Sequence, residues 1–432
     1  MQNGKGLSRS TAFAGAVLTG LLLGNAASAA ERWHIADSRL DALDALLTQH
    51  AGVFAGLSVD PDAQQVIVRI ARPDAAQLTG LLGTLPDGAG AADEPQWAVQ
   101  FKPVRRSMQS LDAIRERVMT QEPWASLVQP VLAQIHVDIQ RNVVAVGVTA
   151  ITPELQQAAE DSFGAAVELY ETQRHSVFAR AAPAASGALS GGAIIKMADG
   201  NHCASGWPVR FDIGTWTGFT TAGHCVVNAG LLTSVSDDSS TYLGSSVAYR
   251  VANFSASNLG ASWRQDSDAG VVSDFAFIGS VPVEPKVHVG GAGSNTRAFV
   301  VGSRAARVGD RVCFSGPYTG ENCSAEIQSL EATAIMVIGG GVALAINGLI
   351  EARSIDGSNI AQPGDSGGPV YMKRSIGSNT VVEAVGSIEG GPVHALTPTA
   401  LFVPIAKVIP NGTSLWTARC ARGPAGTLSC SY

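Results

Sequence analysis

The sequence predicts an all-β C-terminal half, folded as two packed β-barrels, behind an N-terminal half that mixes helices and strands. Residues 189–432 consist of short β-branched runs separated by glycine, serine and asparagine clusters, a spacing typical of sandwiches and barrels. Residues 31–180 instead alternate strand-like and helix-like patterns and contain no cysteine. A β-rich stretch of about 240 residues suits two barrels better than one.

The chain begins with a segment that predicts export. Lys5 and Arg9 accompany an apolar run from Thr11 to Gly24, and the small residues of NAASAA follow it. Residues 1–29 are therefore interpreted as a signal peptide. The run is too short to span a bilayer comfortably, which makes a membrane anchor the weaker alternative. We expect a secreted protein, extracellular or periplasmic, with no membrane anchor after the signal is removed.

Residues 30–188 are predicted to fold as an α+β domain of two similar subdomains. In SRLDALDALL, the side chains of Leu40, Leu43 and Leu47 share one helical face. QQVIVRIARPDAAQLTGLLG and RNVVAVGVTAITPELQQAAEDSFG each predict a strand followed by a helix, with a possible partner strand before each. Chance similarity of two such units is the alternative interpretation. Small residues and one proline make residues 179–188 a predicted linker to the second half.

Composition and cysteine content limit the function classes. The net charge is −7, so no basic surface predicts a nucleic-acid partner. The cysteines all lie in the second half, and in an exported chain their even number suggests three disulfides. Several pairings are open, of which the simplest joins neighbours in the sequence. No CxxC pair or histidine-rich spacing supports a metal site instead. The six are Cys203, Cys225, Cys313, Cys323, Cys420 and Cys430.

The segment QPGDSGGPV surrounds Ser366 with glycines, which suits a nucleophile. A serine hydroxyl needs a base to remove its proton, and an attacked carbonyl oxygen needs hydrogen-bond donors when it becomes negative. Glycine permits backbone angles that aim successive N–H groups at one point. We therefore predict an oxyanion hole formed by the amides of Gly364 and Ser366. A glycine-rich turn without chemistry is the alternative.

Two further residues are predicted to activate the serine. His224, in TTAGHCV, ends an apolar stretch beside Cys225 and is the predicted general base. Asp274 lies within the apolar GVVSDFAFIGS, where a lone acid is costly unless paired, and is predicted to orient the imidazole. Asp266 and Asp268 are weaker candidates because they lie in the polar RQDSDAG.

The order of these residues distinguishes two kinds of hydrolase. GDSGG also fits the G-x-S-x-G turn of α/β-hydrolases, in which the serine precedes the acid and the histidine. Glu383 or Glu389 with His394 would supply that order. That turn must lead into a helix, however, whereas GGPVYM predicts a strand. The order histidine, acid, serine is therefore favoured, and an α/β-hydrolase-type esterase is the weaker alternative.

Together, TAGHC, SDFAFI and PGDSGGPV resemble the three triad segments of chymotrypsin-like serine proteases. LSGG and VCFSGPYTGENC are most similar to the bacterial streptogrisin and alpha-lytic protease group. The resemblance implies a double six-stranded antiparallel β-barrel that hydrolyses peptide bonds of proteins through an acyl-enzyme. His224 would be the base, Asp274 its orienting partner and Ser366 the nucleophile. No metal and no organic cofactor are implied.

The same resemblance implies a zymogen made with a signal peptide and a long prosegment of repeated α/β subdomains. Residues 30–188 would be this prosegment, acting as intramolecular chaperone and inhibitor of the protease domain, residues 189–432. The bond before Leu189 is the candidate processing site. A chaperone has a physical reason, because β-barrels depend on long-range pairings that form slowly. A catalytically inactive relative used for binding or adhesion is the alternative from another class.

The resemblance also implies how the cysteines pair. Two disulfides would match the group, and a third would close a C-terminal loop that the group does not obviously contain. The pairs are Cys203–Cys225, Cys313–Cys323 and, for the C-terminal loop, Cys420–Cys430.

The predicted substrate-binding residues depart from the pattern of the group. Ile360 stands where a cysteine is usual, and Glu389 where a small polar residue is usual. Gly390 and Gly391 would lie beside the substrate backbone. An aliphatic Ile360 favours an uncharged residue before the cut, whereas Glu389 could favour a basic one. We predict an apolar or small residue.

The residue before the serine is also expected to need a partner. Phe314 stands where the group usually has an arginine that neutralises the acid at position 365. Arg311 is predicted to replace it as the partner of Asp365. The amino group freed by processing at Leu189 is the alternative partner.

Overall fold

A computed structural model describes most of the second half and two stretches of the first. The predicted signal peptide, residues 179–187 of the predicted linker and the helix expected after residue 71 lie outside the described residues. The described ranges are 34–71, 95–176, 188–211, 216–227, 234–236, 242–251, 254–257, 264–265, 274–279, 281–338, 342–376, 379–391, 398–409, 413–422 and 428–432.

The first N-terminal unit is a four-stranded sheet covered by one helix. The sheet order is β1-β4-β3-β2, with β3 and β4 parallel and the other pairs antiparallel. Leu40, Leu43 and Leu47 of α2 are buried against the sheet, as their spacing predicts. The elements are β1 (His34–Ala36), η1 (Asp37–Arg39), α2 (Leu40–Gln49), β2 (Phe54–Asp60), β3 (Gln65–Ile70) and β4 (Gln96–Pro103).

The second unit has a related topology. In both units an antiparallel hairpin is followed by a strand that returns parallel to the second strand of the hairpin. Helix α6 begins where the hydroxyl of Thr152 caps the amide of Leu155 and Pro153 occupies the first turn. The elements are α4 (Met108–Thr120), α5 (Trp124–Val128), β5 (Leu132–Asp138), β6 (Val143–Val148), α6 (Pro153–Phe163), η2 (Gly164–Ala166), β7 (Val167–Glu171) and β8 (His175–Ser176).

Beyond residue 188 the described chain is almost entirely strand. The first barrel is a sheet of order β11-β10-β14-β15-β18-β13-β12-β27, which stays open in the part of the chain that the structure describes. Its buried side chains include Ile195, Phe219 and Ile278. Its elements are β10 (Ile194–Met197), β11 (His202–Ala204), β12 (Pro208–Phe211), β13 (Thr217–Thr221), α7 (His224–Val227), β14 (Ser234–Ser236), β15 (Tyr242–Val251), β16 (Phe254–Ser257), β17 (Arg264–Gln265), β18 (Asp274–Gly279) and β27 (Thr413–Leu415).

The second barrel closes. Its six strands pair antiparallel in the ring β21-β22-β23-β26-β25-β24, and β24 returns to β21. The predicted double β-barrel is therefore confirmed, with one barrel closed and the other an open half-barrel. The remaining elements are β9 (Leu189–Gly191), β19 (Val283–His288), β20 (Arg297–Ser303), β21 (Arg311–Gly316), β22 (Gly320–Ile338), β23 (Val342–Ser354), β24 (Pro369–Ile376), β25 (Asn379–Gly390), β26 (Thr399–Pro404), α8 (Ile405–Val408), β28 (Arg419–Arg422) and β29 (Leu428–Ser431).

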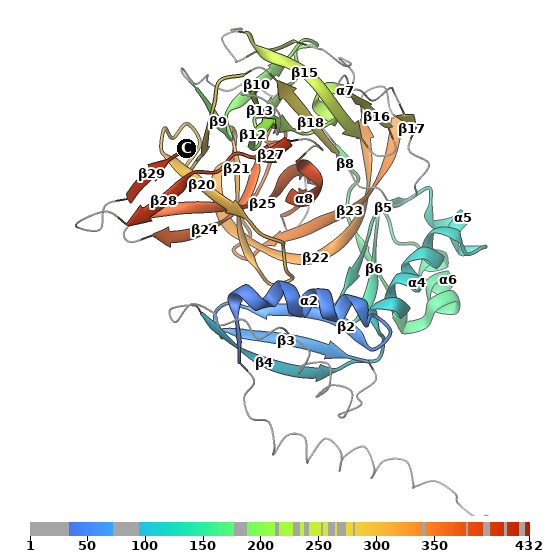
Figure 1. The fold of residues 1–432 in the computed structure, drawn as a ribbon. Helices are drawn as coiled ribbons and strands as arrows, with labels where there is room; N and C mark the ends of the chain where they lie inside the picture. The colour runs from blue at the N-terminus through green and yellow to red at the C-terminus, as the bar shows by residue number, and fades with distance from the viewer. Residues whose placement is uncertain are drawn as a thin grey trace, which may run out of the picture.

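The N-terminal half docks on the closed barrel through a shared sheet (Figure 1). Strand β5 pairs antiparallel with β22, so that residues 134–136 lie opposite residues 332–334. The two-residue strand β8 also pairs with β22. This pairing extends the barrel wall into the N-terminal half, and the backbone groups of β22 that would form a free edge are bonded there.

Charge complementarity adds to this contact. Arg307, only 4% exposed, donates to the Asp41 carboxylate of α2 at 2.5 Å, and Arg311 donates to Asp62 at 2.5 and 3.0 Å. Between these arginines, the Val59 amide donates to the Val308 carbonyl at 2.8 Å. The acidic N-terminal half therefore meets basic side chains of the barrel.

The described α-helices have from four to thirteen residues. None of them combines the length and the apolar character needed to cross a membrane.

Candidate active site

The predicted triad residues come from both barrels. His224 begins α7 shortly after the end of β13, Asp274 is the first residue of β18, and Ser366 lies on the turn before β24. Strands β13 and β18 are paired, with Thr221 opposite Ala276. The end of one strand therefore brings the histidine beside the start of the other, where the aspartate lies.

His224 and Asp274 form a tight buried pair. One Asp274 oxygen accepts the backbone N–H of His224 at 2.7 Å, and the other bonds to the imidazole Nδ1. Burial alone would raise the pKa of Asp274, but the neighbouring imidazole and the hydrogen bonds from His224 lower it below its ordinary value. Asp274 is therefore ionised and holds the imidazole by its Nδ1 side, which leaves Nε2 for chemistry.

The Cys203–Cys225 disulfide braces the histidine from the next residue. Asp266 and Asp268, the weaker candidates for the acid, lie outside the described residues. The geometry of Asp274 meets what a triad acid requires, namely contact with Nδ1 and exclusion from water.

Ser366, on the second barrel, contacts residues of the first barrel and of strand β25. Its carbonyl accepts from the Ala204 amide at 2.8 Å, and its hydroxyl donates to the Glu389 carbonyl at 3.2 Å. The imidazole Nε2 of His224 has no hydrogen-bond partner among the described residues. The hydroxyl and Nε2 are thus not bonded to each other here. Catalytic hydrogen bonds are often loose in the absence of substrate, and a χ1 rotation changes the acceptor of a serine.

The glycines around Ser366 are required by the backbone. Gly364 has φ +97°, and a Cβ there would lie 2.3 Å from the Tyr318 ring. Gly367 has φ +86°, and a Cβ there would lie 2.3 Å from Thr221 Oγ1 and 2.6 Å from the Ala222 amide. Within the described chain, no hydrogen bond from the Gly364 or Ser366 amide to a protein acceptor is formed. Both amides therefore stay available for the oxyanion role predicted from the sequence.

The prediction for Asp365 is wrong. Its carboxylate accepts from the Tyr318 amide at 2.9 Å, from Thr319 Oγ1 at 2.5 Å and from the Gln362 amide at 3.0 Å. Arg311 binds Asp62 of the N-terminal half instead. Burial raises the pKa of Asp365, and these neutral donors oppose that rise. The hydrogen-bonding capacity of the Asp365 carboxylate is therefore met by neutral donors from neighbouring loops and not by a cation.

In the uncleaved chain, the backbone nitrogen of the alternative partner, Leu189, also bonds elsewhere. The Leu189 amide donates to the Pro282 carbonyl at 3.0 Å, within the parallel pairing of β9 and β19.

The predicted substrate-binding residues fall in two different environments. Ile360 is 1% exposed and packs in the core of the closed barrel with Phe314 and Phe402. Gly390 ends β25, and a Cβ on Gly391 would lie 2.5 Å from the Thr399 carbonyl. A side chain at Gly391 would therefore clash with the backbone at Thr399. Contact of any of these residues with substrate stays a prediction.

The side chain of Glu389 was not foreseen as a neighbour of the triad. It is 1% exposed, and one oxygen lies 3.8 Å from His224 Nδ1. Burial and the charge of Asp274 raise its pKa well above the ordinary value. The signal that could have found it is the one used for Asp274, a lone acid inside an apolar strand.

The α/β-hydrolase alternative fails on the structure that follows the serine. Residues after Ser366 enter strand β24 and not a helix, so the turn is not a strand-to-helix elbow. His394, needed for that order, lies outside the described residues.

The cysteines pair as the resemblance implies, in the disulfides Cys203–Cys225, Cys313–Cys323 and Cys420–Cys430. Two groups of potential metal ligands among the described residues contain these bonded sulfurs, which do not ligate as thiolates. The third group is His224, Asp274 and Glu389, with one atom of each within 4.8 Å of the others. A hydrogen bond between His224 and Asp274 already uses the ligand atoms of that pair.

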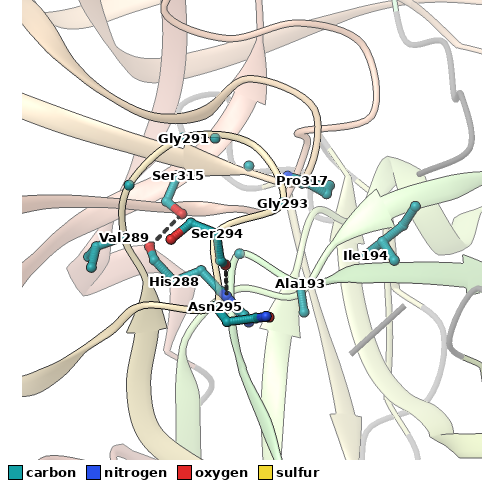
Figure 2. Close-up of a pocket in the computed structure, with 14 residues that line it drawn as sticks. Ala193, Ile194, His288, Val289, Gly291, Gly293, Ser294, Asn295, Ser315 and Pro317 are labelled. Atoms are coloured by element: carbon teal, nitrogen blue, oxygen red, sulfur yellow. Dashed lines mark hydrogen bonds between the residues drawn. The ribbon is translucent and has the colours of Figure 1, made fainter. Parts of the chain in front are cut away.

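A pocket of about 270 Å³ lies beside the loop 315–320, whose Tyr318 donates to Asp365 (Figure 2). The view shows Ser315, Pro317, His288 and Ser294 among the residues that line it, with dashed lines for hydrogen bonds between lining residues. Ser315 donates to the His288 carbonyl at 2.8 Å, and His288 Nδ1 lies 3.2 Å from the Ser294 carbonyl. No triad residue lines this pocket.

Comparison with known proteins gives structural likenesses only. No protein-family model and no curated protein matches the chain. The solved structures to which it is similar include bacterial chymotrypsin-like serine proteases. Protease A of Thermobifida fusca is 26% identical, with 54% of this chain and 100% of that chain covered and a TM-score of 0.37.

Two further structures are similar over about half of the chain. The Nocardiopsis protease is 25% identical, with 51% of this chain and 93% of that chain covered and a TM-score of 0.35. The Cellulomonas bogoriensis chymotrypsin is 23% identical, with 54% and 100% covered and a TM-score of 0.33.

Proposed function

We propose that this protein is a secreted serine endopeptidase that cleaves proteins through a His224–Asp274–Ser366 triad. The observation that carries the proposal is the buried pair of His224 and Asp274. Nε2 of His224 is unbonded, and the glycine-rich turn of Ser366 belongs to the same site. An imidazole held by a carboxylate at Nδ1, with Nε2 unbonded, is the arrangement that a general base beside a serine requires.

The residues present can carry out acyl transfer in two halves. His224 Nε2 takes the proton of Ser366 Oγ while the oxygen attacks the carbonyl carbon of the substrate. The amides of Gly364 and Ser366 donate to the oxyanion. The imidazolium then gives its proton to the leaving amine, which departs and leaves an acyl-enzyme. Water repeats the sequence on the ester and frees Ser366.

Asp274 remains a carboxylate throughout this cycle. Its bond to Nδ1 fixes the tautomer in which Nε2 accepts, and its charge stabilises the imidazolium. The lowered pKa of Asp274 supports this assignment, because the carboxylate stays charged at neutral pH.

We further propose that residues 30–188 are a prosegment that assists folding of residues 189–432 and inhibits them before its removal. The pairing of β5 with β22 supports this role, because it supplies a template for a long-range strand of the closed barrel. Arginine–aspartate contacts around Arg307 hold the template in place. Processing before Leu189 and export after removal of residues 1–29 belong to the same proposal.

The test of the proposed function is cleavage of a denatured protein by the expressed full-length chain. Ser366→Ala should lower turnover about a million-fold, because the triad acts as a unit. Ser375→Ala, at an exposed position on β24, is the matched control and should leave turnover unchanged. Equal turnover in both variants would reject the proposal. Sequenced products should follow apolar or small residues, and cuts confined to lysine and arginine would reject that specificity.

A further inference from the structure

Glu389 is a buried acid that lies beside the triad and receives no hydrogen bond from a described residue. Glu389 is 1% exposed, and neither of its carboxyl oxygens has a hydrogen-bond partner among the N–H and O–H groups of the described residues. A buried carboxylate with no donor costs several kcal/mol, which is why such groups are paired or neutral. The position of Glu389 therefore requires an explanation beyond packing.

Only two titratable groups of the described chain face this carboxyl. Asp274 on β18 is one, and His224 on α7 is the other, with Nδ1 at 3.8 Å from a Glu389 oxygen. Nδ1 is already committed to Asp274. A hydrogen bond between the two carboxyl groups can then form only if one of them carries a proton.

The geometry decides which acid holds the proton. Asp274 accepts both the backbone N–H and the Nδ1 of His224, and these bonds favour its ionised form. Glu389 receives no such bond. The raised pKa of Glu389 and the lowered pKa of Asp274 agree with this division.

We propose that Glu389 is an uncharged carboxylic acid in the resting enzyme and donates its proton in a hydrogen bond to the Asp274 carboxylate, as a positioning residue of the triad. This inference rests on the proposed protease function. The donated bond holds the carboxylate turned toward His224. It also leaves one negative charge, and not two, beside the imidazole that acts as the base.

An ionised Glu389 would have the opposite effect. Two negative charges beside His224 would favour the imidazolium and block its role as base. Deprotonation of Glu389 at alkaline pH should therefore lower activity. This places a proton-dependent element inside the triad, on the same strand whose backbone accepts from Ser366.

The experiment compares Glu389→Gln with Glu389→Leu in the full-length chain. Both keep the side-chain volume approximately, but only glutamine keeps a donor. Glu389→Leu should lower kcat about ten- to a hundredfold with little change in KM, because a hydrogen bond to a charged group is lost. Glu389→Gln should recover most of that loss. Equal kcat in the two variants would contradict the proposal.

Two further readouts separate a proton on Glu389 from a merely structural role. The acidic limb of the pH profile should stay in place in Glu389→Gln, whereas removal of a real negative charge would shift it to lower pH. The infrared difference between wild type and Glu389→Gln at neutral pH should contain the carbonyl band of a protonated carboxylic acid. Only carboxylate bands in that difference would overturn the proposal. This spectrum needs no activity, so it stays informative even if the protein proves not to be a protease.

Discussion

The contact between His136 and Glu351 makes docking of the N-terminal half sensitive to pH. His136 lies on β5 and Glu351 on β23, both are buried, and Nδ1 lies 3.0 Å from Oε2. The Gln134 side chain donates to the same oxygen at 2.5 Å. Burial lowers the pKa of His136, but attraction to the Glu351 carboxylate, 3.0 Å away, outweighs burial and raises it above the ordinary value.

The sign of the effect follows from this shift. A histidine whose pKa is higher when docked than when free binds an extra proton on docking. Its stabilisation is fully present below the free value of about 6.5 and is lost as the pH rises through the higher docked value. Docking should therefore weaken from acidic toward alkaline pH.

His136→Leu removes one partner and leaves Glu351 buried. Breaking a buried pair in this way costs about 3–5 kcal/mol, and because Gln134 still donates, we take the low end, near 3 kcal/mol. That is about a hundredfold in the opening equilibrium of the docked strands. The effect should shrink at alkaline pH, where the wild-type histidine has lost its charge.

The assay is hydrogen exchange of the paired segments 134–136 and 332–334 in the full-length chain carrying Ser366→Ala, which prevents self-cleavage. Protection, corrected for intrinsic exchange rates, is compared between His136 and His136→Leu at several pH values. His50→Leu, the same change at the end of α2, is the control. A mutational effect that does not vary with pH would refute the reasoning, as would an equal effect of His50→Leu.

Three further predictions concern Asp274, Arg311 and the folding of residues 189–432. Asp274→Asn should lower kcat about 10⁴-fold at neutral pH through the wrong imidazole tautomer, measured on a peptide substrate; a loss below tenfold contradicts the triad assignment. Arg311→Ala should leave turnover of the processed enzyme unchanged while raising exchange near Asp62, since Arg311 binds there; a large loss of turnover would restore its pairing with the serine turn. Residues 189–432 refolded alone should yield little activity, and residues 30–188 added in trans should restore it; efficient refolding alone would return the N-terminal half to a spacer or binding module.

Features that depend on a short segment of the chain could be predicted from the sequence. His224, Asp274 and Ser366 each lie in a local pattern from which a role can be predicted without the fold, and the cysteines of the second half pair as the resemblance implies. Leu40, Leu43 and Leu47 form the buried face of α2 because a 3.6-residue period is local as well.

What the sequence could not predict depends on distant segments. The sequence predicts that Arg311 replaces the family's arginine as the partner of Asp365. Its partner Asp62 is instead supplied by the N-terminal half, and no local sequence pattern predicts that contact. The contact of Glu389 with the triad requires the register of β25 against the first barrel. The pairing of β5 with β22 is likewise a property of two strands far apart in the chain, and either could have ended at a solvent-exposed edge.

The most direct measurement of the central claim is the site of covalent labelling by a serine-directed fluorophosphonate, found by mass spectrometry of the processed protein. Attack by Ser366 Oγ on phosphorus needs the same base and the same oxyanion donors as attack on a peptide carbonyl. The adduct is predicted on the peptide that contains Ser366, and it should disappear in His224→Ala. A folded protein that takes up no label, or one that is labelled equally well in His224→Ala, would contradict the assignment of a working triad.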